Sequence, residues 1–329
     1  MKKLLFSLVL LGSFAAFAGD DCMALMQDPK GTYPGGAFLS AVGDGDSLSG
    51  AQSRAMSGLS AIFEVTIKNE LSVRESSETK GGKEDYRSSI SDVSKIQTNQ
   101  KLMNVQFSEN CTDKKTGKVY VIAYLDRAKT APLYVEKIKD LDAQVEKALG
   151  RAKAEPEPIK AFVFLRQAVE KARENEAQKN TLRIIAAPAL AALKDSRPLS
   201  AVADLLYEKV RDLPVSITVQ NDKDDRLKSA FDAAFKKMGF LETGAAEGKI
   251  RLNAVFTVED AGLKNKYYNA RWTLNITLAD QTGKTILTRS ENQRATAVSA
   301  ADAIHRSFKD AEKAIYPILN KAIEALTAK

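Results

Sequence analysis

The chain has 329 residues, of which 44% are apolar and 28% are charged, a balance typical of globular proteins and long enough for about two domains. Its formal net charge is +7 at pH 7, and no dense Lys/Arg tract with interleaved aromatic residues occurs, so we expect no nucleic-acid partner. One histidine and two cysteines are too few for a structural Cys/His zinc site, and we expect no metal and no other cofactor.

The first 18 residues have the pattern of a cleavable signal peptide. Lys2 and Lys3 precede an apolar run over 4–14, and an Ala-x-Ala site places cleavage between Ala18 and Gly19. This run is shorter than the roughly 20 apolar residues that a transmembrane helix needs, and no later segment is longer and as apolar. We therefore expect an exported, periplasmic protein without a transmembrane helix. Its net charge falls from +7 to +5 when Lys2 and Lys3 are removed.

The two cysteines, Cys22 and Cys111, allow three interpretations. Asp21 stands where lipid-attaching enzymes need a small residue, so a lipid anchor on Cys22 is not expected, although association with the outer membrane stays open. In an oxidising compartment a cysteine pair indicates a disulfide, which would stabilise the fold by roughly 4–5 kcal/mol on the chain-entropy account. The alternative is two free, buried thiols.

Residues 19–130 are predicted to form a first α+β domain. We expect a short strand over 38–42, a turn at 43–46 and a helix capped by Ser47. The apolar positions of this helix recur at three- and four-residue spacing: Leu48, Ala51, Ala55, Leu59, Ile62 and Phe63.

Antiparallel strands are expected to complete this domain. Alternation over 71–79 predicts a polar strand, and the Ser-rich, β-branched composition of 86–100 predicts a long strand or ribbon. A hairpin turn at 113–117 leads into the clearest strand, 119–125.

Residues 131–213 are predicted to form a helical middle region. Apolar stripes indicate four helices, over 133–149, 159–172, 177–193 and from 197 onward. Pro188 is expected to kink or end the third helix. We interpret the stripes as packing between helices, because a partner-binding groove has no specific sequence signal here.

Residues 214–329 are predicted to form a second α+β domain with the order β-α-β-β-β-α. Its strands and helices are expected over 215–219, 227–238, 249–258, 267–278, 285–293 and 299–325. The fold class is thus α+β: two small α/β-sandwich-type domains with mainly antiparallel sheets, joined by a helical middle region. Both domains open with a strand, an acidic turn and a helix, which leaves a distant internal duplication open.

The sequence AVGDG at 41–45, followed by an Ala-x-x-x-Ala helix, resembles the Lpp-twenty-like lipoprotein family of bacterial envelopes. The segment 117–127 matches that family's closing strand, so the resemblance covers 38–127. It implies a non-catalytic envelope protein, often membrane-anchored, and related modules occur in flagellar assembly protein T. The C-terminal domain is faintly similar to envelope modules of penicillin-binding-protein activators and to the TolB N-terminal domain, which implies protein interaction.

Two loops that could bind ions have simpler explanations. Glycines at 43–45 could offer backbone N–H groups to a phosphate, but Asp44 would repel it and the third glycine of a dinucleotide fingerprint is missing. A tight turn explains these glycines better. Asp222, Asp224 and Asp225 suggest a calcium loop, but leucine and alanine stand where the loop needs glycine and glutamate, so helix capping is favoured.

The remaining candidates for chemistry are side chains without convergent partners in the sequence. His305 could serve a hydrolase only if a serine and a carboxylate converge on it in space. Tyr267, Tyr268 and Trp272 could form a docking surface, although aromatic residues in alternating strands usually belong to a core. The glutamates Glu157, Glu170 and Glu174 are expected on solvated helix faces. We predict no catalytic residues.

The leading hypothesis is a non-enzymatic, exported cell-envelope protein that acts as a periplasmic scaffold or protein-interaction module with an envelope protein partner. One alternative is an accessory factor in the assembly of a surface structure such as a flagellum or secretion channel. The other is a hydrolase whose site is assembled from distant residues around His305.

Overall fold

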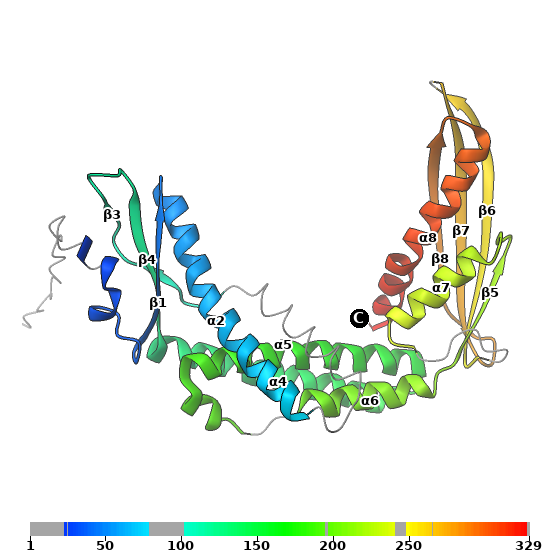
Figure 1. The fold of residues 1–329 in the computed structure, drawn as a ribbon. Coiled ribbons are helices and arrows are strands. Elements are labelled where there is room, and N and C mark those ends of the chain that lie inside the picture. The colour runs from blue at the N-terminus through cyan, green and yellow to red at the C-terminus, as the bar shows by residue number, and fades with distance from the viewer. Residues whose placement is uncertain are drawn as a thin grey trace, which may run out of the picture. The chain divides into compact units, whose positions relative to one another are not determined.

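The chain forms two compact units with separate cores (Figure 1). The computed structural model describes residues 23–24, 26–78, 102–194, 197–240, 248–264 and 266–327, without the side chains of 68–78 and 264. The first unit comprises Met1–Lys139 and Glu174–Asp195, and the second comprises Asp140–Arg173 and Ser196–Lys329. Both contain helices and an open, mainly antiparallel sheet, which confirms the α+β class. The helical residues 131–213 are shared between the two units.

The sheet of the first unit is built around one central strand. β4 (Val119–Asp126) pairs antiparallel with β1 (Phe38–Gly45) along its whole length, and also with β2 (Gln106–Phe107) and β3 (Cys111–Thr112). The turn at 113–117 closes β3 onto β4 as predicted, with the Gly117 N–H donating to the Asp113 carbonyl.

Helix α2 (Leu48–Glu78) covers one face of this sheet at very short range. Ser47 caps the helix as predicted, accepting a hydrogen bond from the Gly50 N–H at 3.2 Å. Ala51 and Ala55 are fully buried against β1. A Cβ on Gly43 would lie 2.2 Å from both the Ala51 carbonyl oxygen and the Ala55 amide nitrogen. Gly43 is therefore required by the close approach of the helix backbone.

This finding corrects the predicted turn at 43–46. Gly43 and Gly45 lie within β1, paired with Val121 and Val119 of β4, and the strand continues to Gly45. Their lack of a side chain makes room for α2; neither adopts the left-handed conformation that a glycine turn requires.

The other face of the same sheet is covered by the chain preceding β1. Because side chains alternate along a strand, Ile122 points away from α2 and is buried together with Met26 and Cys111. Tyr33 packs on Tyr124 of β4, with ring centroids 4.4 Å apart. The short 3-10 helix η1 (Pro29–Gly31) lies within this segment.

Two strands predicted for the first domain, over 71–79 and 86–100, were not confirmed. The stretch 71–78 continues α2 instead of forming a polar strand. Its Leu, Glu and Arg residues are good helix formers, and its apolar/polar alternation is too short to override that preference. The predicted strand over 86–100 lies outside the described residues.

Three helices make up the middle of the chain: α4 (Arg127–Ala154), α5 (Pro158–Ala191) and α6 (Leu199–Arg211). The second and third predicted helices are one element, α5, with a kink where Ala186 leaves the helical region at φ −156° and ψ 78°. The kink near Pro188 was predicted, whereas the separation of 159–172 from 177–193 was wrong. The intervening residues include Arg173, Glu174 and Glu176, whose types favour continuing the helix.

Arg127 supplies the donors that the kink removes. Proline has no N–H, so Pro188 leaves the carbonyl of Ile184, four residues earlier, without its helical partner. The Arg127 guanidinium donates to the carbonyls of Ile184 and Ile185, the latter at 2.8 Å, and to that of Gly35 at 3.1 Å. Burial lowers the pKa of this guanidinium from its ordinary value. One side chain thus joins the start of α4, the kink of α5 and the chain before β1.

The second unit has the predicted order β-α-β-β-β-α. Its sheet follows the order β5-β6-β7-β8, in which β5 and β6 are parallel and the other pairs antiparallel. The strands are β5 (Val215–Gln220), β6 (Ile250–Lys264), β7 (Tyr267–Asp280) and β8 (Thr285–Ala297). Helices α7 (Arg226–Lys237) and α8 (Ala300–Glu324) pack on one face of this sheet (Figure 1).

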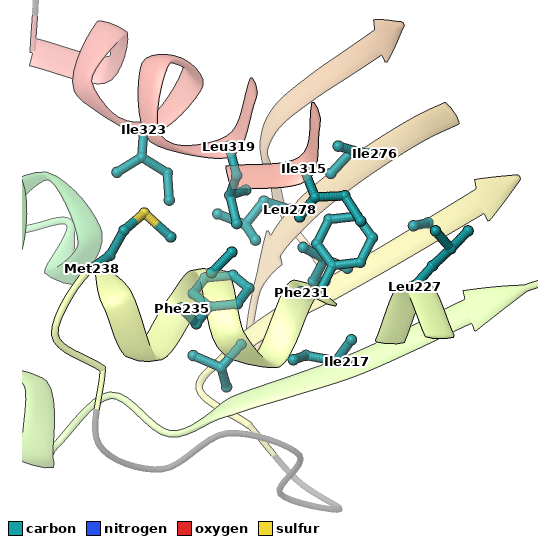
Figure 2. Packing of buried hydrophobic residues seen from close by; sticks show 14 of the residues in the cluster. Ile217, Leu227, Phe231, Phe235, Met238, Ile276, Leu278, Ile315, Leu319 and Ile323 are labelled. Atoms are coloured by element: carbon teal, nitrogen blue, oxygen red, sulfur yellow. The ribbon is translucent and has the colours of Figure 1, made fainter. Parts of the chain in front are cut away.

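The core between these helices and the sheet is made of large side chains. Phe231 and Phe235 of α7 are fully buried and point toward Ile315 and Leu319 of α8 (Figure 2). The alternating side chains of β7 that were predicted to share one face do so: Trp272, Leu274, Ile276 and Leu278 are at most 1% exposed. Among the described helices, none is both long and apolar enough to cross a bilayer.

Candidate functional site

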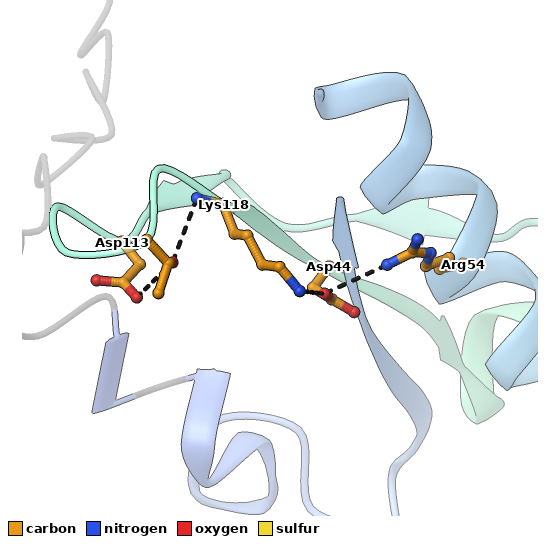
Figure 3. Close-up of polar contacts among 5 residues, drawn as sticks. Asp44, Arg54, Asp113 and Lys118 are labelled. Atoms are coloured by element: carbon orange, nitrogen blue, oxygen red, sulfur yellow. Dashed lines mark hydrogen bonds and ion pairs between the residues drawn. The ribbon is translucent and has the colours of Figure 1, made fainter. Parts of the chain in front are cut away.

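Asp44, between Gly43 and Gly45, forms ion pairs that hold parts of the first unit together, and we call the group of Asp44, Lys118 and Arg54 the clasp. The Asp44 carboxylate accepts from Lys118 Nζ at 2.9 Å and from the Arg54 guanidinium at 3.3 Å (Figure 3). The hydrogen bond from Lys118 holds the pKa of Asp44 below its usual value, with further lowering from the two cationic charges. Asp44 therefore connects β1 and α2 to Lys118, the residue directly before β4, and its negative charge would repel a phosphate.

The acidic cluster before α7 caps that helix, as predicted. The two carboxylate oxygens of Asp222 accept from the backbone N–H groups of Leu227 at 3.0 Å and Lys228 at 2.8 Å. Asp224 and Asp225 adopt positive φ and form the turn into the helix. Within the described residues, no group of three His, Cys, Asp or Glu side chains is placed to hold a metal ion.

The side chains considered for catalysis or docking are dispersed. His305 is exposed on α8 and has no serine or carboxylate partner among the described residues. Trp272 is completely buried in the core, whereas Tyr267 is 51% exposed, so the three aromatic residues do not form one surface. Glu157 pairs with Lys160, and Glu174 pairs with Lys137.

The predicted processing and disulfide positions are only partly described. Cys111 is buried in the first unit, and no described cysteine is a free thiol. Cys22, Ala18 and Gly19 lie outside the described residues. The Cys22–Cys111 disulfide and the cleavage between Ala18 and Gly19 therefore stay predictions.

A groove in the second unit is the strongest candidate for binding a partner. It lies among α4, α5 and α6, has a volume of about 560 Å³, and is lined by Leu149, Gly150, Ala161, Leu165, Leu205 and Lys209. Beneath it the three helices are joined by a small apolar core that includes Val145, Val169 and Val202. The groove is thus an open depression over a packed base, in the size range typical of ligand sites.

The floor of this groove is apolar and its rim is charged. Ala161 and Leu165 of α5 are buried, whereas Leu205 of α6 is 38% exposed. The rim carries both signs of charge: Glu146, Lys153, Arg197, Glu208, Lys209 and Asp212. Arg197 donates to Glu146 at 3.1 Å and so connects α4 to the chain before α6.

Sequence reasoning missed this groove because its stripes were attributed to helix packing. The signal that could have found it is the Leu205–Leu206 pair. Adjacent positions on a helix lie about 100° apart, so the two leucines cannot both face the same packed base. Leu206 packs on that base, and Leu205 is left at the groove. Gly150 and Ala161 keep the opening free of large side chains.

Comparisons with known proteins give a limited likeness. No family model matches the chain, and no curated protein matches it. Among solved structures, the secreted protein HP1454 from Helicobacter pylori is 12% identical with a TM-score of 0.45, over 85% of this chain and 95% of that one. A minor lipoprotein from Acinetobacter baumannii is 15% identical with a TM-score of 0.27, over 35% of this chain and 90% of that one. The Lpp-twenty-like resemblance therefore stays a prediction.

Proposed function

We propose that this chain is an exported, non-enzymatic cell-envelope protein that binds a protein partner through the groove among α4, α5 and α6. The observation that carries the proposal is an open groove between packed helices at which the apolar side chain of Leu205 is exposed to solvent beside Leu149. Exposed apolar surface of this kind, rimmed by polar residues, is typical of protein interaction sites. Export is supported by the basic and apolar sequence that ends at Ala18.

The proposed occupant is an amphipathic helix of an envelope protein. Grooves between helices accept the apolar stripe of a partner helix, whose polar flanks then meet the rim. Leu149, Leu165 and Leu205 provide the apolar floor from three different helices. Charged residues of both signs surround them, which suits a partner with both Lys/Arg and Asp/Glu beside its apolar stripe.

Site-specific photocrosslinking in the native envelope tests the groove. A photoreactive residue at Lys209, on the groove rim, should give one defined adduct, and the crosslinked peptide should have helical apolar spacing. Leu205→Glu should remove the adduct. Tyr207→Glu is the matched control, because Tyr207 lies on the same helix, is 46% exposed and does not line the groove. An adduct that survives Leu205→Glu, or that maps to a segment without helical spacing, would contradict the proposal.

Export has its own test. Mass spectrometry of the protein purified from the periplasmic fraction should give a mature N-terminus at Gly19, without lipid on Cys22. A chain that retains Met1 in the cytoplasm would contradict the export proposal. If the crosslinked partner proves to be a flagellar or secretion-channel subunit, the role becomes that of an assembly factor.

A further inference from the structure

A second cavity in the second unit is smaller and more enclosed than the groove, and has a different lining. It has a volume of about 240 Å³ and lies where the start of α5, the start of β6 and the β7–β8 turn meet. Ile159, Leu213 and Ile250 line it and are nearly completely buried, with Ile286 beside them. These branched side chains form an apolar part of the cavity beside polar lining residues, and its volume is below the range of drug-sized ligand sites.

The opening of this cavity is lined by three lysines, two of which already hold a carboxylate. Glu157 accepts from Lys160 Nζ at 2.9 Å and from Lys284 Nζ at 3.3 Å. The contact with Lys284 joins the start of α5 to the β7–β8 turn across the opening. These hydrogen bonds, that from Lys160 first, hold the pKa of Glu157 below its usual value.

The third lysine is not used by the fold. Lys249 lines the cavity and is exposed, and it has no carboxylate partner among the described residues. The other acid in the lining, Asp280, is engaged in its own turn. One of its oxygens accepts from the Thr282 N–H at 2.8 Å, the Thr282 hydroxyl at 2.6 Å and the Lys284 N–H at 3.0 Å.

We infer that this cavity binds a single carboxylate attached to a compact apolar group. The apolar group fills the space between Ile159, Leu213 and Ile250, and the carboxylate pairs with Lys249 at the opening. A charge-assisted hydrogen bond next to an apolar pocket gives both orientation and selectivity. The site selects against larger ligands by its volume and against cations by Lys249.

Two sources supply this chemistry: a free short-chain organic acid, or the C-terminal residue of a polypeptide that ends in Leu or Val. Titration calorimetry of the full mature chain with 4-methylpentanoate, with the peptide Ala-Ala-Ala-Leu and with its C-terminal amide distinguishes them. Binding of both acids with similar affinity indicates a free organic acid. Tighter binding of the peptide acid by tenfold or more indicates a polypeptide C-terminus. In either case the amide should bind at least tenfold more weakly than the peptide acid.

Variants connect the binding to this cavity. Lys249→Met keeps the length of the side chain and removes its charge, and should weaken binding at least tenfold. Lys228→Met is the matched control, since Lys228 is exposed on α7 and does not line the cavity, and it should leave affinity unchanged. Thr285→Trp, at an exposed lining residue, should block the cavity without altering the core.

The outcomes separate this inference from the proposed function. Leu205→Glu alters only the groove, so it should leave carboxylate binding intact whether or not the groove binds a helix. Equal binding of acid and amide, or no loss with Lys249→Met, would overturn the role of the carboxylate. Absence of binding by both acids at millimolar concentration would overturn the site itself.

Discussion

The two units each pack a helix on a sheet directly after the strand that precedes it, yet they achieve close packing by opposite means. In the first unit, α2 presents Ala51 and Ala55 to a strand that carries Gly43, and the backbones come into contact. In the second unit, α7 presents Phe231 and Phe235, and large side chains fill a wider space. Adding atoms should therefore destabilise the first interface, and removing atoms should destabilise the second.

The shared opening of the two units does not extend to their topology. β1 pairs antiparallel with β4, which follows β2 and β3 in the chain, whereas β5 pairs parallel with β6, the first strand described after α7. Parallel neighbouring strands need a crossover connection, whereas antiparallel strands can be joined by a short hairpin. The resemblance of the two openings is thus one of local sequence, and the internal duplication finds no support in the sheet connections.

The largest expected effect is the loss of a phenyl ring from the second unit. Phe235 is fully buried beside Phe240, with ring centroids 5.2 Å apart. Phe235→Ala should destabilise the unit by about 3–5 kcal/mol, because it removes apolar contacts and leaves a cavity. Urea unfolding monitored by fluorescence reports on this unit directly, since Trp272, the single tryptophan, lies in its core.

Phe235→Leu is the control for that change. It retains most of the buried volume and should cost less than half as much as Phe235→Ala. Similar losses for the two variants would show that the ring volume is not what stabilises α7 on its sheet.

The next effect should come from a single added methyl group in the first unit. The Cβ of Gly43→Ala would meet two backbone atoms of α2, which cannot rotate away as side chains do. We expect a loss of about 3 kcal/mol, at the upper end of overpacking costs. Hydrogen exchange of the β1 and β4 amides should reveal it as reduced protection.

Gly150→Ala is the matched control for Gly43→Ala. Gly150 lies within α4 with no atom within 4 Å of an added Cβ, so alanine should stabilise by about 0.5–1 kcal/mol through helix propensity. If both glycine variants behave alike, the close approach of α2 to β1 is not what selects Gly43.

Sequence reasoning succeeded where periodicity and burial agree. The strands and helices of 214–329 were predicted in the right order, because Trp272 and its alternating neighbours all face one core, although β6 continues past its predicted end at 258 to Lys264. It failed where the reason for a residue lies in a distant part of the chain. Gly43 has the sequence appearance of a turn, and only the position of α2 shows that it is a contact. The groove was missed for the same reason. The sequence shows that Leu205 and Leu206 are apolar, but it does not show that Leu205 lies at the groove.

A third prediction concerns Arg127, whose hydrogen bonds join three segments of the first unit, whereas the core of the second unit is rich in aromatic side chains. Arg127→Met should destabilise by about 2 kcal/mol, since it leaves the carbonyls of Ile184 and Ile185 without these donors. Arg127→Lys keeps the charge but not the planar fork and should restore only part of the loss. Thermal unfolding by circular dichroism measures both.

A double-mutant cycle identifies the cause. Pro188→Ala returns an N–H to the helix opposite the Ile184 carbonyl, so the cost of Arg127→Met should be smaller in that background. Strict additivity of the two changes would contradict the assignment of Arg127 to the kink.

The smallest effect should come from the clasp at Asp44, and it depends on pH. The pKa of Asp44 is lowered in the folded chain by its hydrogen bond from Lys118, so its contribution is present above the unfolded value of about 3.9. It is lost as pH falls from there through the lower folded pKa, where the carboxylate takes up a proton. The melting temperature of the wild type should exceed that of Asp44→Asn at pH 7, and the difference should shrink in this acidic window.

Lys118→Met should give the same pattern, because the two side chains form one contact. Since the pair is partly exposed to solvent, added salt should also reduce the difference. The cost of Gly43→Ala is steric and should depend on neither pH nor salt.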